Sequence, residues 1–132
     1  MSFKKNEIKV RTRYAETDQM GVVHHANYAL YFEMGRTEWL REMGLSYKQM
    51  EENGVMLPVV SMGLNYKKPA LYDEVLKVVT KLKKRPTVKI EFDYEIYNEK
   101  DELLVYGNTV LAFVDIKKNR PVKCPNYILD KL

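Results

Sequence analysis

The chain has 132 residues, a length that predicts one domain, residues 1–132, with a hydrophobic core of its own. Its 45% hydrophobic and 30% charged residues are typical of a soluble globular protein and exclude a disordered chain, and a single cysteine excludes an internal disulfide. The net charge of +4 comes without a long basic run, and no apolar run has the length of a membrane helix. We therefore expect a cytoplasmic protein with no nucleic-acid partner and no stable membrane insertion.

The first third of the sequence predicts a strand, a loop and a long helix. Residues 7–14 alternate apolar with charged side chains, which is the period of a half-buried strand. Farther along, the apolar spacing becomes helical, and the residues that share one face are Tyr28, Phe32, Gly35, Trp39 and Met43. We expect Asn27 to cap the start of this helix, Gly44 to end it, and Arg36 to lie on its opposite, charged face.

The rest of the sequence predicts strands and one short helix. Residues 46–49 form a capping box that starts the short helix, and Gly54 ends it. Alternating apolar residues then predict four strands in succession, at residues 56–66, 74–85, 88–97 and 102–116. The last strand is apolar on both faces for much of its length, so we expect both faces to be covered. This order predicts an α+β fold, with one five-stranded antiparallel sheet that meanders after the helix and curls around one long central helix.

The loop before the long helix concentrates the reactive side chains, with Gly21 to bend the chain. These side chains are Tyr14, Glu16, Thr17, Asp18, His24 and His25. The loop runs into the N-terminus of the helix, where free N–H groups and a partial positive charge favour an anion or a developing oxyanion. We therefore place the active site here. No metal is expected, because adjacent histidines point in different directions and no His-x-x-x-His or cysteine pair completes a tetrahedral set.

A spaced pattern extends through this loop and helix: Tyr14, Thr17-Asp18, Gly21-Val22-Val23, His25, Asn27-Tyr28, Glu33 and Arg36. The pattern resembles the hotdog-fold thioesterases, specifically the 4-hydroxybenzoyl-CoA thioesterase branch and its acyl-CoA thioesterases of the Tol–Pal-cluster type. The resemblance covers nearly the whole chain. It implies the hotdog fold and an acyl-CoA thioesterase that hydrolyses an acyl thioester to the free acid and the thiol, with no metal or organic cofactor.

The resemblance also implies a role for each matched residue of the loop. Asp18 is the catalytic carboxylate, acting as nucleophile on the thioester carbonyl or as general base on water, although aspartate is also a favoured turn residue. The backbone N–H of His25 polarises that carbonyl, and the His25 side chain and Tyr14 support the site. Asn27 and Tyr28, at the start of the helix, are expected to bind the substrate.

Outside the loop, the resemblance points to a basic pair and to an oligomer. Lys84 and Arg85 fall where relatives hold the phosphates of coenzyme A, and the alternative is a solvated strand end. Resembling proteins pair two sheets edge to edge, with an active site at each junction. Since one helix covers only one face of the predicted sheet, we expect a homodimer or a homotetramer.

Two alternative functions stay open, a hotdog dehydratase or hydratase and a non-catalytic acyl-CoA-binding protein. Glu33 bears on the first, because carboxylates on the central helix are catalytic acids in other hotdog branches. We favour instead an ion pair of Glu33 with Arg36 or with a partner subunit. A serine hydrolase is disfavoured because Ser61 lacks the Gly-x-Ser-x-Gly elbow, and Cys124 is interpreted as a packing residue.

Overall fold

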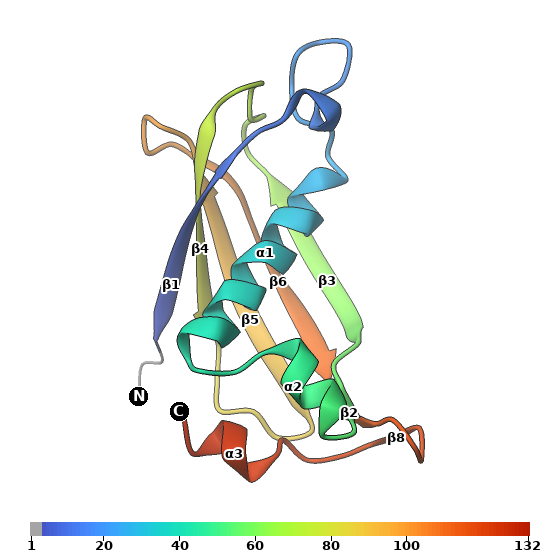
Figure 1. Ribbon diagram of the computed structural model, residues 1–132. Coiled ribbons are helices and arrows are strands. Elements are labelled where there is room, and N and C mark those ends of the chain that lie inside the picture. Colours follow the sequence, from blue (N-terminus) through green and yellow to red (C-terminus); the bar gives the residue numbers. More distant parts are fainter. Residues whose placement is uncertain (1–3) are drawn as a thin grey trace.

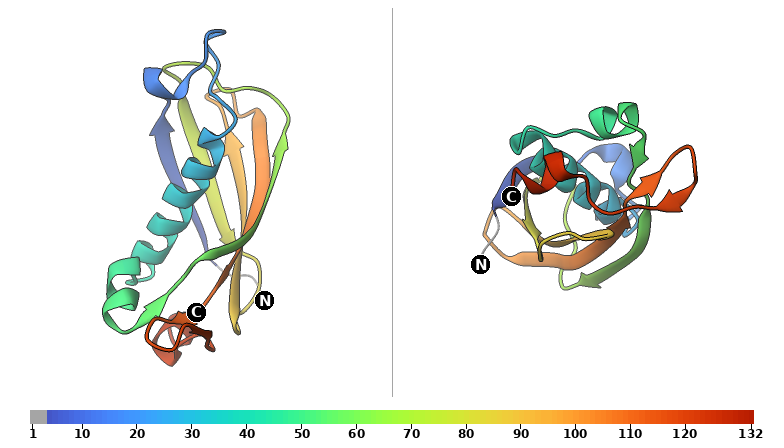
Figure 2. Two further views of the ribbon diagram at one scale, coloured as in Figure 1. Left: turned by 90° about the vertical axis from the view of Figure 1, so that its right-hand side faces the viewer. Right: turned by 90° about the horizontal axis from the view of Figure 1, so that it is seen from below.

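Helix α1, Asn27–Glu42, lies along the concave face of a curved antiparallel sheet in this computed structural model, which describes residues 4–132 (Figure 1). Seen from below, the sheet curls around the helix, so the helix occupies the centre of the fold (Figure 2). The buried apolar side chains of the helix and the sheet form one cluster. The structure confirms the predicted α+β class, with five strands wrapped around one long helix.

Five strands form the main sheet, and every neighbouring pair is antiparallel. In order across the sheet they are β1 (Lys5–Arg11), β4 (Val75–Leu82), β5 (Lys89–Tyr97), β6 (Leu103–Ala112) and β3 (Val59–Tyr66). Only β4, β5 and β6 follow one another as a meander. The prediction of four meandering strands was wrong for β3, which pairs with β6 at the edge. The alternation within a strand predicts which of its faces is buried, but it does not predict which strand lies next to it in the sheet.

Short elements complete the chain: η1 (Tyr14–Glu16), α2 (Tyr47–Glu52), β2 (Val55–Met56), β7 (Val114–Asp115), β8 (Arg120–Pro121) and α3 (Asn126–Leu129). Strands β2, β7 and β8 form a small second sheet. The predicted strands at residues 56–66 and 102–116 are thus each divided in two. Pro58 interrupts the first of them, because it has no N–H to donate to a ladder.

The predicted start of α2 at Ser46 and its stop at Gly54 are confirmed, but within residues 4–132 only one of the two bonds of the predicted capping box is formed. The Ser46 hydroxyl accepts from the Gln49 N–H at 3.1 Å, and Gly54 has φ +85° just past the helix. The C-terminal end of α1 is likewise confirmed at Gly44, whose φ is +79°. Its N–H donates to the Arg41 carbonyl at 2.9 Å, so a residue that tolerates the left-handed conformation ends the helix there.

The N-terminal end of α1 differs from the prediction. The cap position is Ala26, which has no side-chain oxygen, so the prediction of Asn27 as the N-cap was wrong. Asn27 is instead the first helical residue. Its side-chain amide donates to the Glu16 carbonyl at 2.9 Å, because the preceding loop folds back and brings that carbonyl over the helix start.

The predicted apolar face of α1 is the face that packs on the sheet. Phe32 and Trp39 are fully buried, and Phe32 stacks on Tyr94 of β5 with 4.2 Å between ring centroids. Gly35 lies where the helix comes closest to β4. A Cβ atom at Gly35 would lie 2.3 Å from Thr80 Oγ1, which is inside van der Waals contact. The absence of a side chain at Gly35 therefore allows α1 to rest directly on the sheet.

Arg36 is a second departure, because it is buried rather than on the outer face. Its Nε donates to the Tyr47 hydroxyl at 3.0 Å, so α2 covers this side of α1 and the pattern of α1 alone could not reveal it. Glu33 is exposed, and no ion pair joins it to Arg36 within the described residues, so the favoured intrachain pair is not formed.

Candidate active site

The loop between η1 and α1 folds back on itself at the upper end of the molecule in Figure 1. Thr17 and Val23 form an antiparallel bridge, and the Asp18 N–H donates to the Val22 carbonyl at 2.8 Å. Gly21 has φ +77°, which confirms its predicted role in bending the chain. The Val23 N–H donates to the Ala70 carbonyl at 2.8 Å, so the end of the loop also lies against the segment before β4.

Asp18 uses its two carboxylate oxygens differently. Oδ1 accepts from the N–H of Met20 at 2.8 Å and of Val22 at 3.4 Å, which closes the turn. Oδ2 accepts no hydrogen bond from residues 4–132, and we call it the open oxygen of Asp18. The turn role and a chemical role are therefore compatible, because they fall on different atoms.

Glu16 is the buried carboxylate of the loop, with 6% of its surface exposed. It accepts from the Arg13 N–H at 2.8 Å and from the Tyr31 hydroxyl at 2.9 Å, and the Arg13 guanidinium adds two more bonds. Burial by itself raises the pKa of the Glu16 carboxyl, but these hydrogen bonds outweigh it and hold the pKa below its usual value. Glu16 is therefore an ionised group inside the loop. From the sequence, Glu16 was counted among the reactive side chains of the loop, but no function was predicted for it.

His25 precedes the first turn of α1, and its backbone N–H has no acceptor within residues 4–132. We call this group the open N–H of His25. The neighbouring ring of His24 stacks on the His25 ring at 4.2 Å, and its Nδ1 accepts from the Ala26 N–H at 3.2 Å. The open N–H lies at the positive end of the helix dipole, a position that suits negative charge on an oxygen.

A pocket of about 260 Å³ opens beside the His25 side chain. Its lining residues are Val23, His25, Tyr28, Tyr66, Lys67, Lys68 and Pro69. Tyr28 is buried, its ring packs edge-on against Tyr66 at 5.7 Å, and its hydroxyl accepts from the Ala70 N–H at 3.0 Å. The structure thus brings His25 and Tyr28 together around an aromatic and partly basic cavity, and their roles toward substrate stay predictions.

One wall of this pocket is formed by residues that no sequence pattern predicted for the site, namely Tyr66, Lys67 and Lys68. The run Tyr-Lys-Lys-Pro at the end of the strand predicted for residues 56–66 carried a signal, because it places one aromatic and two basic residues together. Lys68 forms an ion pair with Glu102, and the Lys67 ammonium lies 5.7 Å from the centre of the Tyr106 ring. Both lysines are therefore anchored beside the cavity.

Tyr14 and Asn27 are not among the residues that line the pocket. Tyr14 is 79% exposed, and its ring packs edge-on against Tyr72 at 5.7 Å. The side-chain amide of Asn27 is occupied by the Glu16 carbonyl. Asp18 also lies outside the lining, on the turn that leads to His25, so substrate contacts of these three residues stay predictions.

Lys84 and Arg85 lie at the opposite end of the sheet, in the turn between β4 and β5 (Figure 1). The eight residues of β4 span roughly 25 Å and separate this turn from the loop of Asp18. The Lys84 ammonium forms an ion pair with Glu91 at 2.9 Å. Within one chain, the predicted phosphate-binding pair therefore does not reach the pocket.

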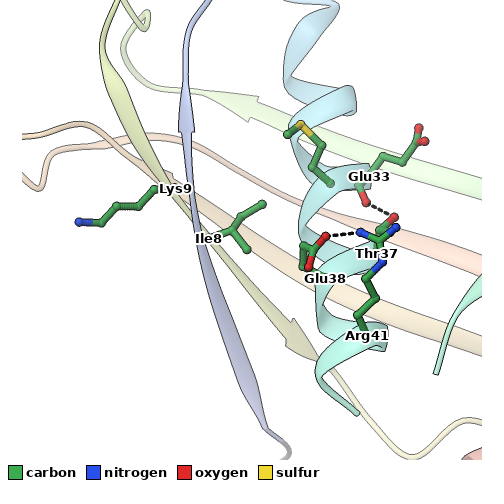
Figure 3. Close-up of a pocket in the computed structure, with 7 residues that line it drawn as sticks. Ile8, Lys9, Glu33, Thr37, Glu38 and Arg41 are labelled. Carbon is green, nitrogen blue, oxygen red and sulfur yellow. Dashed lines mark hydrogen bonds and ion pairs between the residues drawn. The ribbon is translucent and has the colours of Figure 1, made fainter. Parts of the chain in front are cut away.

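A larger groove of about 550 Å³ lies between α1 and β1, away from the loop (Figure 3). Ile8 points from β1 toward the helix, and Glu33 and Arg41 project from α1. Arg41 pairs with Glu38, so charges of both signs offset each other there. The groove holds none of the loop residues. Within residues 4–132, no group of three metal-ligating side chains lies together, and no helix is long and apolar enough to cross a membrane.

The sequence profile of the Thioesterase-like superfamily matches residues 12–132. The chain belongs to this superfamily. The putative acyl-CoA thioesterase YneP of Bacillus subtilis is 41% identical to this thioesterase-like chain over 123 residues, which cover 93% of the chain and 88% of the relative. The acyl-CoA thioester hydrolase YbgC of Escherichia coli O6:H1 is 32% identical over 120 residues, which cover 91% of the chain and 90% of the relative.

Solved structures agree with this membership. A DHNA-CoA thioesterase from Staphylococcus aureus superposes with a TM-score of 0.89 at 38% identity, covering 96% of this thioesterase-like chain and 85% of that chain. The predicted resemblance to hotdog-fold thioesterases is thereby confirmed, and with it thioester hydrolysis as the class of activity.

Proposed function

We propose that this thioesterase-like protein hydrolyses acyl-CoA to the free carboxylic acid and coenzyme A, with no metal or organic cofactor. The observation that carries the proposal is the open N–H of His25 at the start of α1, beside an aromatic pocket in the described part of the chain. Thioester hydrolysis places negative charge on the carbonyl oxygen, and a fixed donor at that position lowers the barrier. The names of the relatives, acyl-CoA thioesterase and acyl-CoA thioester hydrolase, support acyl-CoA as the substrate.

In the proposed reaction, the thioester oxygen accepts a hydrogen bond from the open N–H of His25. A nucleophile adds to the carbonyl carbon, and the electron pair of the C=O bond moves to that oxygen. When the pair returns, the carbon–sulfur bond breaks and the thiolate leaves. A thiolate is a weak base, so its departure needs little acid assistance. The dipole of α1 adds to the stabilisation of the oxygen charge.

Asp18 supplies the attacking group through its open oxygen. As a general base it takes a proton from water, and as a nucleophile it forms a mixed anhydride that water then hydrolyses. Both routes need a carboxylate oxygen that no hydrogen bond from residues 4–132 occupies, and Oδ2 meets that need. The ring of His25, on the pocket wall, and Tyr14, at the outer edge of the loop, are proposed to support the substrate.

The pocket at Tyr28 and Tyr66 is proposed to hold the acyl group next to the thioester. Its aromatic rings offer apolar contact, and the rest of its lining is Val23, Pro69 and two lysines, whose long alkyl stems are apolar. Asn27 is proposed to act at the same place, as the first residue of the helix that carries the oxygen-binding end.

We also propose that the active form is a homodimer or homotetramer. Strand β3 pairs only with β6 among the described residues, and its Val59, Val60 and Met62 are exposed. Antiparallel pairing of two β3 edges would bring the Lys84 end of one copy to the same side as the Asp18 loop of the other. This arrangement would let Lys84 and Arg85 serve a site that they cannot reach within one chain.

The remaining expectations are kept as parts of this proposal: residues 1–132 act as one domain, in the cytoplasm, without a nucleic-acid partner. The rival hydratase activity is disfavoured by Glu33, which is exposed beside the groove between α1 and β1 and does not line the pocket at His25. A catalytic acid for that chemistry would have to reach the bound acyl chain.

A panel of acyl-CoA substrates, with release of free thiol measured, tests the proposal. The expected result is turnover of at least one acyl-CoA with a kcat in the range of about 1–1,000 per second. Tight binding of acyl-CoA without thiol release would support the non-catalytic alternative instead. Consumption of an enoyl-CoA with its thioester bond intact would support the hydratase.

A further inference from the structure

Glu16 forms hydrogen bonds on both sides of the loop that leads to His25. Its carbonyl oxygen accepts from the His24 N–H at 2.8 Å and from the Asn27 side chain at 2.9 Å. Its carboxylate accepts from the Tyr31 hydroxyl at 2.9 Å, one turn into α1. One residue thus connects the start of the loop to both the peptide before His25 and the helix behind it.

The carboxylate of Glu16 has no room for another partner. Oε1 accepts from the Arg13 N–H and the Tyr31 hydroxyl, and Oε2 accepts from Nε and Nη2 of Arg13 at 3.2 and 3.1 Å. A carboxylate has about four lone-pair positions, so all of them are used. Glu16 therefore cannot take a proton from water, whereas Asp18, two residues later, keeps its open oxygen.

We propose that Glu16 is a positioning residue that holds the open N–H of His25 in the direction needed by the thioester oxygen. This inference rests on the proposed function. The carboxylate fixes η1 against α1 through Arg13 and Tyr31, and the carbonyl then fixes the His24 peptide, one residue before the donor. Without the carboxylate, the loop would lose its link to Tyr31, and the His25 N–H would no longer be held relative to the helix.

The sign of the effect separates positioning from simple charge. Glu16 is an anion close to the place where negative charge develops, so its field opposes the transition state. If Glu16 acted only through its charge, Glu16→Gln would raise kcat. If it acts by positioning, Glu16→Gln lowers kcat, because the new NH₂ group is a donor that faces the donors of Arg13 or Tyr31.

The experiment compares Glu16→Gln and Tyr31→Phe with wild type and with Tyr94→Phe. Tyr94 is a matched control because it is also buried and its hydroxyl is paired, with Thr109 Oγ1 at 2.6 Å, but it lies on β5 away from the loop. Each protein is assayed for kcat and KM on one acyl-CoA. Each is also bound to a ketone analogue of that substrate, in which CH₂ replaces the thioester sulfur, and the carbonyl stretching frequency is recorded.

Glu16→Gln is expected to lower kcat about 100-fold and Tyr31→Phe about tenfold, because a displacement of about 1 Å can cost two orders of magnitude. KM should change less than about threefold. A hydrogen bond from the His25 N–H should lower the carbonyl stretching frequency of the bound analogue relative to the free analogue, which is a red shift. Most of this red shift should be lost in both variants and kept in Tyr94→Phe. If Glu16→Gln does not fold, Tyr31→Phe decides the question alone.

The outcomes separate this inference from the proposed function. Suppose that wild type turns over and shows the red shift. If Glu16→Gln and Tyr31→Phe then leave kcat and the carbonyl stretching frequency unchanged, or raise kcat, the positioning role alone is overturned. A wild-type protein with neither thiol release nor a red shift would overturn the proposed function and this inference with it. If kcat and the red shift fall equally in the Tyr94→Phe control, the losses reflect general destabilisation, and the inference is also overturned.

Discussion

The two ends of the sheet both carry polar and charged residues but differ in whether these residues already have partners within the chain. At the loop end, Asp18 and His25 each keep an atom that nothing in residues 4–132 occupies. At the other end, Lys84 is paired with Glu91, and the Cys124 N–H donates to the Thr87 carbonyl at 2.6 Å. Within one chain, the Lys84 ammonium is therefore already paired, whereas Oδ2 of Asp18 and the N–H of His25 are left for a ligand.

The largest expected effect is the loss of activity in Asp18→Asn. We expect kcat to fall by at least about 100-fold, the usual contribution of general-base catalysis, while the fold is kept because Asn can also close the turn. Asp115→Asn is the matched control, since Asp115 Oδ1 accepts from the Lys118 N–H at 2.9 Å in a similar turn at the other end. Near-normal turnover in Asp18→Asn would show that the loop end does not carry the catalytic carboxylate.

A second test asks whether the distant basic pair serves the site through a partner copy. The double variant Lys84→Ala/Arg85→Ala should raise KM for acyl-CoA by about tenfold or more, because each charge-assisted hydrogen bond to a phosphate is worth about 1.5–3 kcal/mol. A truncated pantetheine thioester lacks the nucleotide and should show no change.

The matched control for that test is Lys117→Ala/Lys118→Ala, in the exposed turn between β7 and β8. Light scattering of each variant reports the oligomer. Equal effects on both thioesters, or none on either, would make Lys84 and Arg85 ordinary solvated side chains. An active monomer would contradict the proposed arrangement of copies.

How far the sequence predicted the fold is clear from these elements. The period of α1, its stop at Gly44 and the alternation of the strands depend on neighbouring residues, so local patterns were sufficient. The position of β3 next to β6 and the burial of Arg36 under α2 depend on contacts between distant segments. No period within one element carries that information.

The candidate site, too, could be predicted only where it depends on residues that are neighbours in sequence. The loop and the helix start are adjacent in sequence, so Asp18 and His25 could be placed together with the positive end of a helix. The wall of Tyr66 and Lys67 comes from the end of β3, which the fold alone brings to Tyr28. The saturated bonding of Glu16 could not be read from composition, since it requires Tyr31 and Arg13 to meet on one carboxylate.

A smaller effect is expected in the pH dependence of stability at the loop end. The pKa of the Glu16 carboxyl lies below its ordinary 4.5 in the folded protein, so its ionised form stabilises the fold above that pH. This contribution is lost as the pH falls through the folded pKa. Urea unfolding should show Glu16→Gln to be about 1–3 kcal/mol less stable than wild type at pH 7, with a difference that narrows below pH 4.5. Parallel curves would contradict the ionised, hydrogen-bonded state.

The smallest effect should come from Cys124, at the opposite end. Burial raises the pKa of its thiol to about 11, so little thiolate is present at pH 8. Treatment with iodoacetamide at pH 8 should leave the mass and kcat of the folded protein unchanged over an hour. Stoichiometric alkylation with loss of turnover would contradict the buried, unreactive state of this thiol.

The most direct test of the central claim is a crystal structure of Asp18→Asn with an intact acyl-CoA bound. The account predicts the thioester oxygen within about 3 Å of the His25 backbone nitrogen, with the acyl group beside Tyr28 and Tyr66. A thioester bound in the groove between α1 and β1, or an oxygen turned away from the start of α1, would contradict it.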